Sequence, residues 1–276
     1  MADEVVAGIG KIRSLGKMRF YKEMKQYWRF AVYAARSDLR AEVANSYLNW
    51  LWWILEPMAS MVIYTIVFGI VFKTNEEYFP IFIFIAITLW DFFNRCMTSS
   101  VDLIRGNQHI ISRVYMPKYI LLIQRMLVLA FKMLINLGLV VIMMIIYKVP
   151  VGFNIIFVIP TLLVFYVFCF ACGTVLLHIG VYVSDLSNAI NIVLNLLFYV
   201  TGIFYNVQTS IPKPFGYLLQ RINPIAHLIF CMRKCILHNE MPSCIMLGIW
   251  LVISILIASL GLHWIYKSEN DYVKMI

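Results

Sequence analysis

Six charged residues lie inside otherwise apolar stretches of this sequence, and they are its first candidates for chemistry. They are Glu56, Asp91, Arg95, Asp102, Arg125 and Lys132. A charge in hydrocarbon is costly, so such side chains pair with one another or border a water-filled path for an ion or a polar substrate. Asp91 and Arg95 are four residues apart, which puts them on one face of a helix. Glu56 directly precedes Pro57 and should face protein or water.

The same charges predict a ladder between the second and third apolar stretches. At 1.5 Å per helical residue, Arg95 and Lys132 both lie about 22 Å from the outer ends of their stretches, and Asp91 lies about 16 Å from its end. Asp102 and Arg125 both lie about 33 Å from those ends. We therefore expect Asp91 to pair with Arg95 and Lys132, and Asp102 to pair with Arg125. Pairing that only assembles the two helices is favoured over direct contact with a substrate.

Aromatic residues make up 15% of the chain, and eight of those in or near the apolar stretches could bind a sugar. Sugar rings have apolar faces that favour flat aromatic surfaces, and Tyr and Trp add a polar group. The candidate glycan path consists of Tyr64, Phe68, Trp90, Phe93, Phe198, Tyr199, Phe204 and Tyr205. Aromatic residues in membrane helices mostly pack against neighbours or form interface belts, and packing is the favoured interpretation here.

Motifs for bond-breaking chemistry are not found. A phosphate-binding loop needs the pattern GxxxxGK followed by Ser or Thr. The nearest glycines are Gly10 and Gly16, with Lys17, but the spacing is one residue too long and Met18 stands where Ser or Thr is needed. No HExxH or GxSxG pattern occurs. We expect no catalytic residue in this chain and no nucleotide bound by it.

Cysteine and histidine do not form a metal pattern either. Cys169 and Cys172 make a CxxC inside an apolar stretch, where packing is favoured over redox chemistry. A second loose set matches no zinc spacing; it comprises Cys231, Cys235, His238 and Cys244. We expect no metal and no cofactor in this chain.

The elements that must position these residues are long apolar helices. Of the 276 residues, 62% are hydrophobic and 13% are charged, whereas a soluble domain has about 25% charged residues. The mean hydropathy is +0.81, which indicates an integral membrane protein in contact with lipid. Six segments approach the roughly 20 residues that span a bilayer; they are 51–72, 80–102, 119–147, 154–183, 188–205 and 244–266. The sequence predicts a cytoplasmic N-terminus over 1–49 and one membrane domain over 50–276.

The distribution of basic residues predicts the orientation. Nine lysines and arginines precede Leu51, three lie in 105–118 and two follow Tyr266. The opposite loops hold one each at Lys73 and Lys148, and four more lie in the region 206–243. Basic residues collect on the cytoplasmic side, so both termini should be cytoplasmic. The net charge of +9 is explained in the same way, and no nucleic-acid partner is expected.

Segment 20–49 does not span; it predicts a basic amphipathic helix in the membrane interface. Apolar residues recur at three- and four-residue steps from Phe20 to Leu39, and basic residues fall largely on other faces. The residues of interest on this helix are Trp28, Arg29, Arg36 and Arg40. A solvated helix that packs on a partner is the alternative.

Segment 206–240 does not span either. Three prolines interrupt it, and its apolar pieces 215–222 and 225–237 are each too short to cross a bilayer. Such pieces can enter the membrane and return on the same side, which is tolerated only where protein or a cavity surrounds the backbone. An ordinary outer loop with surface helices remains the alternative.

The polar stretch 106–117 connects the second and third apolar segments on the cytoplasmic side. A proline cannot continue a helix, and the residue before it avoids helical geometry. We expect a short separate helix with Asn107 at its N-cap and a small apolar face that docks on a partner. The residues of this site are Asn107, Ile110, Ile111, Arg113, Val114 and Pro117. A plain connecting loop is the alternative.

Several short motifs, in this order, resemble the permease subunits of ABC exporters for O-antigen, capsule and wall teichoic acid. The resemblance covers roughly residues 25 to 270. It rests on Asn45-Ser46-Tyr47-Leu48, Trp50-Leu51-Trp52-Trp53, Glu56-Pro57, Ile63-Tyr64, Val67-Phe68-Gly69, the run from Asn107 to Pro117, Ser184-Asp185, Gly202-Ile203-Phe204-Tyr205, Asn223-Pro224-Ile225 and Arg233. The chain departs from the family pattern at Asn49, Glu56 and Met116, which leaves the exact cargo open.

The resemblance implies an all-α membrane protein with six transmembrane helices per subunit. It implies a homodimer with two ATP-binding subunits that hold ATP and Mg²⁺, in the bacterial cytoplasmic membrane. Segment 20–49 would be the interfacial gate helix, 106–117 the helix that couples to the ATPase, and 206–240 a pair of re-entrant helices. The cargo would be an undecaprenyl-linked glycan or a teichoic acid. Other cargo for the same architecture, a membrane-embedded transferase and an ion-coupled flippase are the alternatives.

Overall fold

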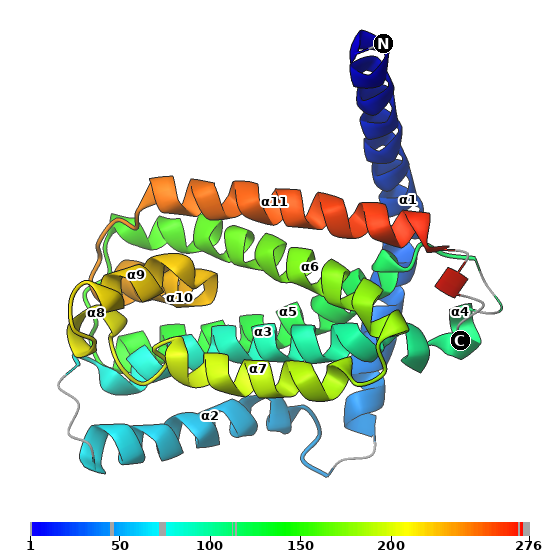
Figure 1. Ribbon diagram of the computed structural model, residues 1–276. Helices are drawn as coiled ribbons and strands as arrows, with labels where there is room; N and C mark the ends of the chain where they lie inside the picture. The colour runs from blue at the N-terminus through cyan, green and yellow to red at the C-terminus, as the bar shows by residue number, and fades with distance from the viewer. Residues whose placement is uncertain are drawn as a thin grey trace.

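The computed structural model describes residues 2–44, 47–71, 76–111, 113, 115–269 and 271–272, with side chains from residue 19 onward apart from those of residues 49 and 71. Within these residues every regular element is helical (Figure 1). The longer helices are α1 (Ala2–Ala44), α2 (Trp52–Tyr64), α3 (Phe79–Gly106), α5 (Tyr119–Ile146), α6 (Val158–Tyr182), α7 (Leu186–Val200), α10 (Pro224–Leu237) and α11 (Cys244–Lys267). The shorter helical pieces are η1 (Asn49–Leu51), η2 (Thr65–Val71), α4 (Gln108–Ile111), η3 (Phe153–Phe157), α8 (Val207–Ser210) and α9 (Phe215–Ile222).

Five of the described helices are long and apolar enough to cross a membrane. They cover Trp52–Ile70, Phe79–Gly106, Tyr119–Ile146, Phe153–Tyr182 and Cys244–Lys267. These agree with five of the six predicted segments. The sixth predicted segment forms α7, which has 15 residues and is therefore about 22 Å long. It ends where the chain turns at Gly202, whose φ of 75° suits glycine better than other residues.

Helix α3 lies at the centre of the bundle, and most of its side chains are buried. Helices α2, α5, α6, α7 and α10 pack around it, and α11 packs on α6 (Figure 1). Glycines allow the closest approaches, as small residues do between membrane helices. A side chain at Gly180 of α6 would collide with the backbone of Val101 in α3. One at Gly261 of α11 would collide with Thr174 of α6.

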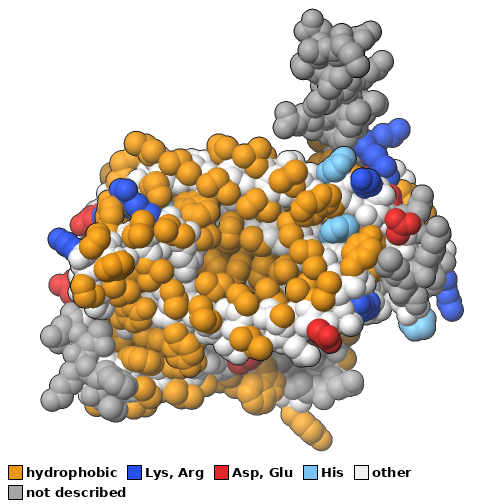
Figure 2. Space-filling view, in the orientation of Figure 1, with side chains coloured by type: hydrophobic (Ala, Val, Ile, Leu, Met, Phe, Trp, Pro, Cys, Tyr) orange, Lys and Arg blue, Asp and Glu red, His pale blue; other side chains and the backbone are white. Residues whose placement is uncertain are grey.

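One face of the bundle is apolar along its length. In Figure 2 hydrophobic side chains cover the visible face over α11, α6 and α7, and charged side chains gather toward its two ends. Exposed residues along these helices include Ile159, Ile192, Val252 and Leu256. This distribution is the one expected of helices in contact with lipid, because charges at membrane depth are costly.

Helix α1 crosses one end of the bundle at a steep angle to the other helices (Figure 1). Its described side chains confirm the predicted amphipathic character, since Ala31 and Ala35 are buried whereas the basic residues Arg29, Arg36 and Arg40 are exposed. Trp28 is also on the exposed side, with 46% of its surface accessible. The helix runs much further toward the N-terminus than segment 20–49.

The opposite end of the bundle carries the region between α7 and α11. The predicted pieces 215–222 and 225–237 form α9 and α10 almost to the residue. Asn223 separates them: its side-chain oxygen accepts hydrogen bonds from the backbone N–H groups of Ile225 (3.0 Å) and Ala226 (3.3 Å). This is an N-cap, and Pro224 follows it at the first helical position, where a missing N–H costs nothing.

Candidate functional site

The charges on α2 and α3 form one linked cluster in the middle of the bundle. Arg95 donates from Nε to Asp91 at 2.7 Å, as predicted, and from a terminal nitrogen to Glu56 at 2.6 Å. The guanidinium therefore lies between two carboxylates from two helices. This contact gives Glu56 the partner that sequence reasoning did not find.

The predicted pairing of Lys132 with Asp91 is wrong. Lys132 on α5 instead lies 2.5 Å from Glu42 of α1, and Arg125 lies 3.8 Å from the same carboxylate. Asp38, one turn earlier on α1, accepts a hydrogen bond from Gln124 at 2.9 Å. Helix α1 thus packs on α5 through a polar row that the depth calculation could not include, because it treated only the spanning segments.

The predicted pair between Asp102 and Arg125 is also wrong. Asp102 accepts a hydrogen bond from the hydroxyl of Ser187 at 2.9 Å, at the start of α7. Arg125 turns to Glu42 instead. Both residues nevertheless line one cavity of about 510 Å³ between α1, α3 and α5. Its polar lining consists of Ser37, Asp38, Ser99, Asp102, Asn107, Gln124 and Arg125.

The eight aromatic residues of the predicted path come together where α2 and η2 meet α3 and α7. Phe68 and Phe204 stack with ring centres 4.1 Å apart, and Tyr64 lies 4.8 Å from Phe204. Phe198 links this group to Trp90 at 5.5 Å. The remaining members Phe93, Tyr199 and Tyr205 join through ring contacts or a hydrogen bond. Three of these residues are buried, namely Trp90, Phe93 and Phe204. Of the other five, four are half-buried and Tyr199 is 65% exposed.

The predicted helix over 106–117 is wrong in its extent. The structure has a single turn, α4, over Gln108–Ile111. Asn107 serves mainly the preceding helix, because its side-chain nitrogen donates to the carbonyl of Leu103 at 2.8 Å. The chain then becomes irregular before Pro117, which is buried. A buried proline next to α5 explains why the helix cannot continue.

The predicted docking face divides between surface and interior. Ile110 is 43% exposed and Arg113 is exposed. Ile111 is buried at 5% exposure and joins the core, so its side chain is not offered to a partner. Val114 lies outside the described residues.

Helix α1 is also tied to the C-terminal segment through a group we call the C-terminal clamp: Arg19, Glu23, Tyr115 and Glu269. Arg19 donates to Glu23 at 2.6 Å, to the hydroxyl of Tyr115 at 3.0 Å and to Glu269 at 3.1 Å. Tyr115 in turn donates to Glu269 at 3.2 Å. Burial and the charge of Glu269 raise the pKa of Tyr115, so it remains a neutral donor. The clamp joins α1, the segment after α4 and the C-terminal segment.

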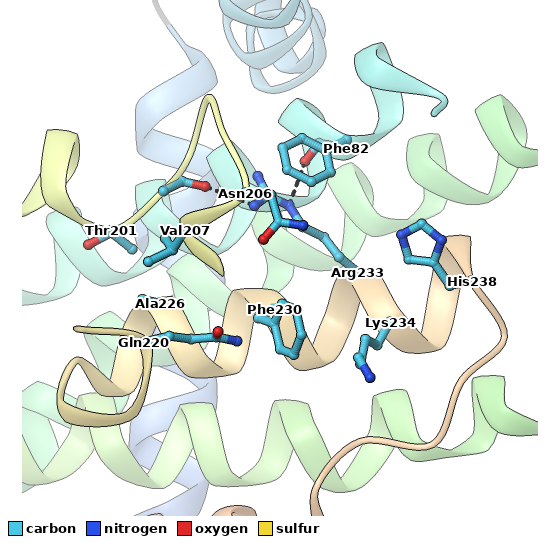
Figure 3. Close-up of a pocket in the computed structure, with 11 residues that line it drawn as sticks. Phe82, Thr201, Asn206, Val207, Gln220, Ala226, Phe230, Arg233, Lys234 and His238 are labelled. Carbon is cyan, nitrogen blue, oxygen red and sulfur yellow. Dashed lines mark hydrogen bonds between the residues drawn. The ribbon is translucent and has the colours of Figure 1, made fainter. Parts of the chain in front are cut away.

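At the other end of the bundle Arg233 anchors α10. Its guanidinium donates to the carbonyls of Phe82 (3.1 Å), Gly202 (2.8 Å) and Ile203 (2.7 Å), and it lies 3.3 Å from the centre of the Phe82 ring. Figure 3 shows it beside a cavity of about 30 Å³. The carbonyls at the end of α7 are thereby satisfied by a charged donor from another helix. Sequence reasoning singled out Arg233 as a motif residue but not for this contact.

These clusters consist of hydrogen bonds, ion pairs and ring contacts between helices. Among the described residues, no group of three or more His, Cys, Asp or Glu side chains could hold a metal ion. The clusters hold helices together and place polar groups within an apolar bundle.

The five long apolar helices define a multi-pass helical membrane protein. The chain belongs to the ABC-2 type transporter family, whose sequence model matches residues 20–237. It is 22% identical over 225 residues to the O-antigen export system permease protein RfbA of Myxococcus xanthus, covering 82% of this chain and 86% of that protein. It is 21% identical over 211 residues to the protein of the same name from Klebsiella pneumoniae, covering 76% of this chain and 81% of that one.

Proposed function

We propose that this chain is the permease subunit of an ABC transporter that exports a lipid-linked polysaccharide across the bacterial cytoplasmic membrane. The observation that carries the proposal is the family match over 20–237, together with relatives named as O-antigen export permeases along most of their length. The cargo is an undecaprenyl-linked glycan or a teichoic acid. The polar and aromatic residues inside the bundle support a polar cargo, because an apolar one would not need intramembrane charges.

The working unit in this proposal is a dimer of two copies with two separate ATP-binding subunits. ATP and Mg²⁺ bind to those subunits, since this chain has no phosphate-binding loop of the required pattern. Both termini are cytoplasmic, and the α1 end of the bundle faces the ATPases. The residues of this chain that meet them are the exposed Ile110 in α4 and the exposed Arg113 just after it.

The proposal adds a sixth span and a re-entrant pair to the five long helices. The sixth span consists of α7 and the turn that follows it. Helix α7 packs against α3. The re-entrant pair is α9 and α10, and the burial of α10 against α3 and α6 supports its place at membrane depth. Helix α1 is the gate helix, because its buried face lies on the end of the bundle and its arginines face outward.

Co-purification and ATP depletion test this function. The chain is expressed in its native cells with an affinity tag, ATP-binding subunits that co-purify with it are identified, and export of surface polysaccharide is measured. We expect a stable complex, and we expect export to stop when ATP is depleted or the chain is deleted. The proposal is refuted if the chain never associates with an ATP-binding subunit and export continues after ATP is depleted.

A further inference from the structure

A small polar cavity lies at mid-bundle, between α2, α3 and α5. Its volume is about 70 Å³, which is room for about two water molecules. The lining combines an indole, a hydroxyl, an amide and four charged groups; its main members are Trp53, Glu56, Ser60, Asp91, Arg95, Lys132 and Asn136. This lining lies next to the aromatic cluster along α3, but it shares no residue with it.

The charged groups of this cavity open onto the surface of the single chain. The side chain of Glu56 is 60% exposed, and those of Asp91 and Arg95 are 39% and 37% exposed. Charges at this depth do not face lipid; they face protein or a water-filled path. The face of α2 and α3 that carries them therefore borders such a path.

Asn136, which lines the cavity, carries a buried hydrogen-bond acceptor that lacks a donor in the part of the chain that is described. The residue is only 5% exposed, yet its side-chain oxygen has no hydrogen-bond partner within the described structure. A buried acceptor without a donor costs about 1–3 kcal/mol. Such a group is rare and requires an explanation, such as a ligand or an ordered water.

The charges around Asn136 leave no spare cation. Arg95 lies between two carboxylates, and Lys132 is paired with Glu42. In the described chain, one carboxylate oxygen of Glu56 and one of Asp91 accept no hydrogen bond. Among the described residues, three acceptor oxygens of the lining are therefore without a donor: one each on Asn136, Glu56 and Asp91. A phosphodiester group cannot donate a hydrogen bond to them, because it has only acceptor oxygens and carries a negative charge.

We infer that this cavity is a subsite for the hydroxyl edge of an uncharged sugar, and that it disfavours a polymer of phosphodiesters. Sugar hydroxyls donate to Asn136 and to the free carboxylate oxygens, and the apolar face of the ring packs on Trp53. A phosphodiester brings a negative charge to a lining whose cations Arg95 and Lys132 are already paired with carboxylates. The inference rests on the proposed function and narrows its cargo from glycan or teichoic acid to an uncharged glycan.

Binding to the complete permease–ATPase complex in lipid nanodiscs tests the inference. The probes are maltohexaose, which is uncharged, and a hexamer of glycerol phosphate, which is polyanionic; binding is measured by saturation-transfer NMR. We expect maltohexaose to bind and the hexamer to bind more weakly. Asn136→Leu should weaken maltohexaose binding about fivefold, the value of one ordinary hydrogen bond. A wild-type complex that prefers the hexamer, or that binds neither probe, overturns the inference.

Two further variants separate binding from folding. Thr88→Val is the matched control. Thr88 lies on α3, and its hydroxyl is also buried and without a hydrogen-bond partner in the described structure, but it does not line the cavity. It should leave binding unchanged, and equal losses in Thr88→Val and Asn136→Leu would overturn the inference. Glu56→Gln removes one of the two counter-charges of Arg95, so the hexamer should bind more tightly to it. If the hexamer binds no more tightly to the Glu56→Gln complex than to the wild-type complex, the subsite is also contradicted.

The two proposals fail in distinguishable ways. ATP-dependent export of the native polysaccharide is measured in parallel with the same variants. If export proceeds while maltohexaose does not bind, only the subsite is refuted. If no ATP-dependent export occurs at all, the proposed function is refuted regardless of the probes.

Discussion

Arg233 offers the sharpest test of how the end of α7 is held. Replacement by methionine removes three hydrogen bonds to the carbonyls of Phe82, Gly202 and Ile203. Hydrogen bonds to a charged group contribute about 1.5–3 kcal/mol each, so the gross loss is about 5–9 kcal/mol. Removal of a buried guanidinium offsets several kcal/mol of this loss. Interhelical hydrogen bonds in membranes average about 0.6 kcal/mol, which sets a lower bound of about 2 kcal/mol for three.

We therefore expect Arg233→Met to lower the free energy of unfolding by about 3 kcal/mol. The assay is unfolding of the purified permease in mixed detergent micelles, followed by circular dichroism. Arg221→Met is the matched control, because Arg221 is exposed on α9 and contacts only Tyr217 in the described chain. It should cost below about 0.5 kcal/mol. Equal stability of the Arg233 and Arg221 variants would refute the anchoring role.

The remaining predictions concern the α1 end and one surface pair. Ile110→Asp should uncouple ATP hydrolysis from export without loss of membrane insertion, and full export by this variant would contradict the coupling role of α4. Glu269→Gln should loosen the C-terminal clamp by about 1 kcal/mol, seen as faster hydrogen exchange at the end of α11, and unchanged exchange would exclude it. Glu42→Gln leaves Arg125 and Lys132 of α5 without their carboxylate partner, so the midpoint of thermal unfolding should fall. An unchanged midpoint would show that the polar contacts between α1 and α5 do not stabilise the protein. A hydrogen bond from Lys234 lowers the pKa of Glu240, so its stabilising effect is present above the ordinary carboxyl pKa and lost as the pH falls through the lowered value. Glu240→Gln should remove that part of the acid dependence of stability, and an identical acid profile would contradict this.

Local patterns in the sequence predicted local structure well. Long apolar runs predicted six spanning segments, of which five form helices long and apolar enough to span, and the separation of Asp91 and Arg95 by four residues predicted their ion pair. Asn223 followed by proline marked the boundary of α10, because capping depends on neighbouring residues only. In each case the signal and the structure lie within one or two turns of the chain.

Contacts between distant segments were predicted less well. The depth calculation matched Arg125 and Lys132 with acids on the neighbouring span, but α1 places Glu42 beside both. Nothing in the pattern of 20–49 shows which spanning helix it crosses. Sequence reasoning likewise treated Ile111 as part of a docking face, whereas the structure buries it.

By itself, the sequence determined that this protein lies in a membrane, roughly where the five long apolar helices begin and end, and which charged residues lie within apolar segments. These properties follow from residue-by-residue transfer free energies and from short-range helix geometry. The tertiary structure alone decided how α1 crosses the bundle, which acid meets each base, and that Asn136, whose side-chain oxygen has no partner in the described structure, lines a polar cavity. Such features depend on the angles and rotations at which helices pack, and many arrangements satisfy the same hydrophobic pattern.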